Sequence, residues 1–128
     1  MAEITMNVSW IAVVVGAVAA FLVGWLWYSP MLFGKKWASG HGIEMDSAAK
    51  MPVVAMVSQF VGLFLLSWFV GVTAVESKLL TFILAVVAFG VLNFSGSQFA
   101  RKPPIVGYVD FGYWIVAAVV MFVAQAIF

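Results

Sequence analysis

We predict an all-α membrane protein, a bundle of four transmembrane helices with an interfacial segment after the first helix. The composition is the first observation: 66% of the 128 residues are hydrophobic and 9% are charged, against roughly 25% charged residues in a typical soluble domain. The second is four long apolar segments, and the third is that none of them shows the period-two alternation of a barrel strand. A soluble globular fold is excluded, because so few charged groups cannot cover its surface.

Each apolar segment is long enough to cross the hydrocarbon core as a helix, which takes about 20 residues. The sequence predicts one integral membrane domain over residues 1–128, with spans at about 8–28, 53–75, 79–97 and 105–128. The first span is not expected to be a cleaved signal, because no Lys or Arg precedes Lys35. The short connection between residues 75 and 79 predicts an antiparallel hairpin, and Pro103-Pro104 marks the start of the last helix.

The positions of the basic residues predict the orientation. Five of the six lie in the first and third connections: Lys35, Lys36, Lys50, Arg101 and Lys102. Because Lys and Arg favour the cytoplasmic side, loops 29–52 and 98–104 are expected there, with both termini on the outer side, which is the periplasm if the host is a Gram-negative bacterium.

The segment after the first span is rich in aromatic residues. Ser29 is placed to cap a helix and Pro30 to start one, so that four side chains lie along the membrane surface: Met31, Leu32, Phe33 and Trp37. Lys35 and Lys36 would then reach lipid phosphates. The alternative is an irregular loop.

Small residues recur every four positions in the first span: Ala12, Gly16, Ala20 and Gly24. They share one helix face, as do two pairs in the second span, Ser58 with Gly62 and Ser67 with Gly71. Small residues let transmembrane helices approach closely. The stripe predicts tight helix contact within the chain or, alternatively, a seam between two copies.

Polar side chains lie at one depth in three spans. Gln59, Asn93 and Asp110 are all roughly 7–10 Å inside the lysine-bearing boundary at 1.5 Å per residue, and Tyr113 follows one turn after Asp110. We expect these groups to partner one another, since buried polar atoms need partners. Asp110 is the one carboxylate in a span. It either caps or hydrogen-bonds the helix start and fixes packing through Asn93 or Tyr28, serves a proton- or cation-coupled transport site, or docks another subunit or a lipid headgroup.

The chain lacks the groups that most enzymes and cofactor proteins use. It has no cysteine and one histidine, His41, so thiolate metal sites and cysteine nucleophiles are absent. A metal site of His41, Glu44 and Asp46 is disfavoured, and an enzyme acting on lipid would have to rely on Tyr28, Ser29 and His41. The net charge of +1 does not indicate the basic surface that nucleic-acid-binding proteins carry. We therefore expect no enzyme activity, metal, cofactor or nucleic-acid partner.

Residues 24–37, with the sequence GWLWYSPMLFGKKW, resemble the signature of a family of small bacterial inner-membrane proteins of unknown function, approximately G-x-x-W-Y-S-P-x-L-F-G-K-x-W. Residues 110–113 are similar to the family's D-x-x-Y at the start of the last helix. The resemblance implies four transmembrane helices and a bacterial host, but no activity. It singles out a set of positions: Trp27, Tyr28, Pro30, Phe33, Gly34, Lys35, Trp37, Asp110 and Tyr113. The four-helix small multidrug transporters resemble the chain in size and span count only, because their coupling carboxylate lies in the first helix, where this sequence has Gly16, Ala20 and no acid.

These observations favour a non-enzymatic membrane protein, an accessory or assembly subunit or a homo-oligomeric scaffold, with membrane lipid around it. The alternative is a small proton- or cation-coupled transporter that uses Asp110.

Overall fold

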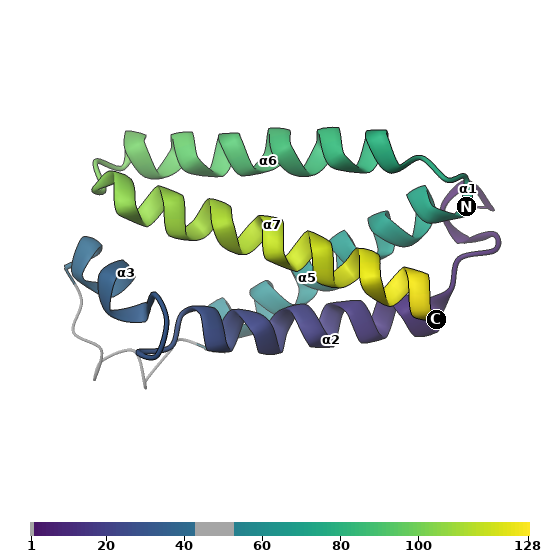
Figure 1. Cartoon of the computed structure of the whole chain (residues 1–128), viewed down its shortest axis with the longest axis horizontal. Helices are drawn as coiled ribbons and strands as arrows, with labels where there is room; N and C mark the ends of the chain where they lie inside the picture. The colour runs from purple at the N-terminus through teal and green to yellow at the C-terminus, as the bar shows by residue number, and fades with distance from the viewer. Residues whose placement is uncertain (1, 43–52) are drawn as a thin grey trace.

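The computed structural model describes residues 2–42 and 53–128, and every regular element in this part of the chain is a helix (Figure 1). The elements are α1 (Ala2–Thr5), α2 (Trp10–Trp27), α3 (Gly34–Gly40), α5 (Val53–Val75), α6 (Leu79–Phe99) and α7 (Pro104–Ile127). By length and hydropathy, α2, α5, α6 and α7 are each able to cross a membrane. The predicted fold class is confirmed, and the four apolar helices indicate a multi-pass membrane protein.

Local signals set the helix ends. The Ser9 hydroxyl accepts a hydrogen bond from the Ala12 amide at 3.3 Å and so caps α2. Pro104 occupies the first position of α7, where its missing N–H costs nothing. The four long helices begin and end within two residues of the predicted bounds.

The four long helices run alternately up and down, and both termini lie at the same end of the bundle (Figure 1). We call this the terminal end, and the opposite end, where α3 lies, the lysine end. Helix α2 packs against α7 and α5, and α7 also packs against α6. Although a short turn joins α5 to α6, the two helices diverge from it, and α6 packs mainly on α7.

Glycines allow α6 and α7 to pack closely. A Cβ on Gly90 of α6 would lie 2.7 Å from the ring of Phe111 on α7, and a Cβ on Gly107 of α7 would lie 2.4 Å from the ring of Phe94 on α6. Each helix therefore receives an aromatic ring from the other at a position without a side chain. Such close approach stabilises helix pairs in lipid, where there is no water to expel.

The small-residue stripe of α2 faces the other helices of the same chain. Ala12, Gly16 and Ala20 are buried, and a Cβ on Gly16 would lie 2.7 Å from the Ser67 hydroxyl oxygen on α5. That hydroxyl donates a hydrogen bond of 2.7 Å to the carbonyl of Val13. The stripe therefore brings α5 close enough to bond the backbone of α2.

The interfacial segment differs from its prediction in where its helix starts. Helix α3 begins at Gly34, not at Pro30, and lies at the lysine end of the bundle (Figure 1). Residues 28–33 form a turn in which the Ser29 hydroxyl donates to the Leu26 carbonyl at 2.6 Å and the Ser29 carbonyl accepts from the Gly34 amide at 2.9 Å. Because these bonds fold the chain back on the end of α2, the helix starts only after the turn. Glu44, Asp46 and Lys50 lie outside the described residues.

Candidate functional site

Asp110 is the centre of the most connected polar site in the described structure. It lies in the second turn of α7 and is half-buried. Its Oδ1 atom accepts one hydrogen bond from the Tyr28 hydroxyl at 2.5 Å and a second from Trp37 Nε1 at 3.0 Å. Asp110 is not a helix cap, because the N-cap of α7 is Pro103. Its carboxylate instead ties the end of α2 and helix α3 to α7.

Trp27 makes a second link to the same part of α7. Its Nε1 donates to the carbonyl of Val109 at 3.0 Å. The indole ring lies against Gly112, where a Cβ would come within 2.9 Å of Cζ2. On the other side, the Phe33 ring packs at a centroid distance of 4.6 Å. The glycine of α7 thus provides room for the tryptophan of α2.

Tyr113 makes the third link and is 2% exposed. Its hydroxyl donates to the carbonyl of Ala20 at 2.8 Å, and a Cβ on Gly24 would lie 2.8 Å from that hydroxyl oxygen. The Tyr28 ring meets the Tyr113 ring edge-on at 5.6 Å. The side chain of Gln59 reaches the same hydroxyl from α5.

Residues 24–37 and residues 110–113 therefore meet in one contact, which we call the clasp. Phe111, between the clasp residues, points instead to Gly90 of α6. The two segments of the sequence that carry the family resemblance are thus one structural unit. Gly112 and the bond from Trp37 to Asp110 were not anticipated from the sequence. A glycine inside a helical pattern was the available signal for the first.

Not every residue of segment 24–37 takes part in the clasp. Pro30 and Lys35 are exposed, whereas Gly34 is buried. A Cβ on Gly34 would lie 2.2 Å from the Tyr28 carbonyl oxygen, so only glycine fits at the start of α3. The aromatic residues and Gly34 thus make the clasp, while Lys35 is left on the surface.

The polar residues predicted at one depth do not form one cluster. Gln59 reaches Tyr113, but Asp110 bonds to Tyr28 and Trp37 instead. Asn93 has no hydrogen bond to any of the other three within the described ranges. It lies on α6, which packs on α7 away from α5.

His41 ends α3 and packs on Trp37, with ring centroids 4.1 Å apart. Its Nε2 atom is buried and has no hydrogen-bond partner among residues 2–42 and 53–128. Burial and, secondarily, the charge of Lys102 hold the pKa of His41 below its usual range, while Asp110 acts in the opposite direction. The lowered pKa favours the neutral imidazole, which packs on Trp37.

The groups considered for an enzyme or a metal site have other partners where the structure describes them. Tyr28 donates to Asp110 and Ser29 to Leu26, and no hydrogen bond joins either of them to His41 within the described chain. The described residues contain no group of three or more potential His, Asp or Glu metal ligands. Glu44 and Asp46, the suggested companions of His41, are not among them.

The comparison with protein families assigns the chain to a family. The family model DUF1761, described as a protein of unknown function, matches residues 11–125. The chain belongs to this family. The match covers α5 and α6 completely, all but the outermost residues of α2 and α7, and both halves of the clasp. No curated protein and no solved structure matches the chain.

Proposed function

We propose that this member of the family is a non-enzymatic subunit of a membrane assembly, made of its own copies or of this chain and another membrane protein. The observation that carries the proposal is an uncovered half-helix. Every residue of α5 from Val53 to Gly62 is exposed, whereas the second half of α5 contributes buried residues to the core. Gln59 reaches Tyr113 and the Phe60 ring meets Phe21 at 5.7 Å, but the rest of the first half offers an open face to a transmembrane helix from another chain.

The glycines of the spans support this assignment. A Cβ on Gly16, Gly24, Gly71, Gly90, Gly107 or Gly112 would come within 3.0 Å of a side chain of the same protein. At Gly62, and at Gly96 near the end of α6, nothing lies within 4 Å. Gly62 follows Ser58 by one helical turn, the spacing at which small residues let membrane helices approach closely.

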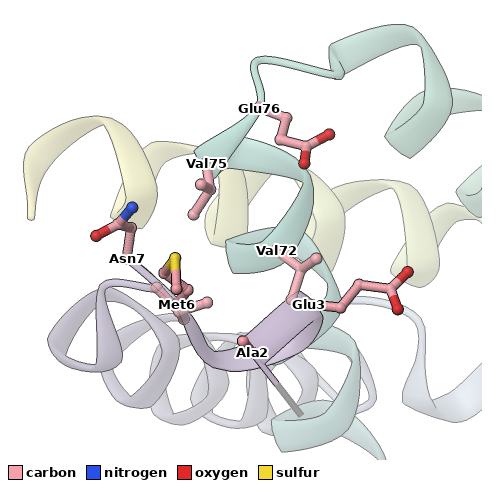
Figure 2. Close-up of a pocket in the computed structure, with 8 residues that line it drawn as sticks. Ala2, Glu3, Met6, Asn7, Val72, Val75 and Glu76 are labelled. Atoms are coloured by element: carbon pink, nitrogen blue, oxygen red, sulfur yellow. The ribbon is translucent and has the colours of Figure 1, made fainter.

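The clasp supports a non-enzymatic role. Asp110 accepts hydrogen bonds from two aromatic donors, which supports a packing role for its carboxylate. Two surface grooves among the described residues, with volumes of about 340 and 290 Å³, lie at the terminal end, and Asp110 lines neither of them (Figure 2 shows the larger of the two).

Disulfide crosslinking in native membranes tests the assembly proposal. The chain contains no cysteine, so a single Gly62→Cys variant carries a unique thiol. We expect oxidation to give a covalent dimer if the chain self-associates through this face. If its neighbour is another protein, a bifunctional thiol-to-amine reagent should give a heavier adduct.

Val18→Cys is the matched control. Val18 is 41% exposed on α2, nine residues from the lysine end of its helix, as Gly62 is from the start of α5. Crosslinks from position 62 and none from position 18 support the proposal. A monomer under both reagents, or equal crosslinking from both positions, contradicts it.

We also propose that the chain lies in a bacterial inner membrane with the lysine end in the cytoplasm. The distribution of basic residues supports this orientation. We expect an impermeant maleimide added to intact spheroplasts to label Asn7→Cys and not Lys36→Cys. Lysis should expose both, and labelling of position 36 before lysis would overturn the orientation.

A further inference from the structure

The lysine end of the bundle carries positive charge that its own carboxylates do not neutralise. Lys35, Lys36 and Arg101 are exposed there. Asp110, the one carboxylate among the described residues of this end, is turned to Tyr28 and Trp37. Over the whole sequence, the first and third connections hold five basic residues against two acidic ones, Glu44 and Asp46. By contrast, Lys78 at the terminal end pairs with Glu76 at 3.3 Å.

Two exposed apolar side chains come shortly before Lys35 and Lys36 in the sequence. Met31 is 82% exposed and Leu32 46% exposed, in the turn that immediately follows α2 and precedes α3. Phe33, the next residue, instead packs on Trp27. The turn thus presents two apolar side chains, and α3 two ammonium groups, where a membrane-spanning α2 would reach the interface. Apolar contact combined with basic groups is how proteins bind anionic lipid surfaces.

The clasp also holds the backbone of this surface in place in the absence of a ligand. The turn is closed by hydrogen bonds from the Ser29 hydroxyl and from the Gly34 amide. Helix α3 is held by Trp37 on Asp110. Since the backbone that carries the lysines is already ordered, binding need not order it.

We infer that the turn of residues 28–33 and the start of α3 bind an anionic phospholipid. Lys35 and Lys36 contact its phosphate, and Met31 and Leu32 contact its acyl chains. Charge complementarity selects the occupant, because a headgroup with a net negative charge gains from both ammonium groups and a zwitterionic one gains less. The inference does not rest on the assembly proposed for α5, which lies on a different surface.

Native mass spectrometry of the full chain released from detergent micelles tests the inference. The probes are phosphatidylglycerol and phosphatidylcholine with the same acyl chains. We expect the wild type to retain phosphatidylglycerol preferentially. The double variant Lys35→Gln/Lys36→Gln should bind it more weakly by about fivefold per lysine, or about 25-fold for the pair. Met31→Ser/Leu32→Ser should weaken binding of both lipids and leave their ratio unchanged.

Lys78→Gln is the matched control, an exposed lysine at the terminal end, and it should leave retention of phosphatidylglycerol unchanged. Soluble glycerol phosphate separates a lipid site from a simple phosphate site. Equal retention of the two lipids by the wild type would overturn the inference. So would an equal loss in Lys78→Gln, or displacement of phosphatidylglycerol by millimolar glycerol phosphate. Crosslinking through Gly62 is independent of all three results.

Discussion

Replacing Asp110 by leucine is expected to lower the free energy of unfolding by about 3 kcal/mol. The substitution removes the acceptor of the Tyr28 hydroxyl and of Trp37 Nε1. A donor left without its partner in a buried site costs about 1–3 kcal/mol, and both donors here are half-buried. Titration with sodium dodecyl sulfate in mixed micelles, followed by tryptophan fluorescence, measures the change.

Two further variants test whether the loss of stability in Asp110→Leu comes from the lost hydrogen bonds, from the lost negative charge, or from the removal of any polar side chain. Asp110→Asn keeps an oxygen acceptor, so we expect it to lose less than half as much stability as the leucine variant. Gln125→Leu, later in the same helix, removes a buried Nε2 without a partner among the described residues and should be neutral or stabilising. If Asp110→Leu proved as stable as the wild type, Asp110 would not hold the clasp together.

Gly34→Ala is expected to destabilise the protein by about 2–3 kcal/mol and to loosen α3. The added Cβ would lie 2.2 Å from the Tyr28 carbonyl oxygen and 2.7 Å from that of Ser29. Both are backbone atoms that cannot rotate away, and forcing extra volume into a packed site costs about 1–3 kcal/mol. Amide hydrogen exchange over residues 34–40 should accelerate, and the same detergent titration gives the free energy.

Gly96→Ala is the control for this prediction. Gly96 lies in α6 with nothing within 4 Å of an added Cβ, so alanine should be neutral or stabilising by up to about 1 kcal/mol through helix propensity. The left-handed backbone region plays no part at Gly34, since Gly42 is the one described glycine with a positive φ. Similar effects of the two substitutions would show that close approach at Gly34 does not matter.

The positions of the long helices were predictable because hydropathy along the chain carries that information directly. An apolar run such as residues 53–75 must be helical in lipid, where every backbone polar group needs an internal partner. Prolines at 103 and 104 fixed the start of the last helix. The helix after α2 was placed too early, because Pro30 is equally suited to a turn, and the hydrogen bonds of Ser29 made it one.

The partners of the polar residues were only partly predictable. Counting 1.5 Å per residue gives the depth of Gln59, Asn93 and Asp110 but not the direction in which each side chain points. Tyr28 was one of two partners considered for Asp110, and the structure joins them. Trp37 was expected to lie along the membrane surface, but its Nε1 also reaches Asp110.

The sequence by itself determined that this chain is an all-helical membrane protein with four spans, and it located the two segments that form the clasp. Only the tertiary structure decided that these segments bind each other, that the stripe on α2 is covered within the chain, and that the first half of α5 is not. The physical reason is that hydrophobicity in lipid fixes which residues lie in the membrane. The choice of neighbours depends on how particular rings, glycines and hydrogen-bond donors fit together across helices.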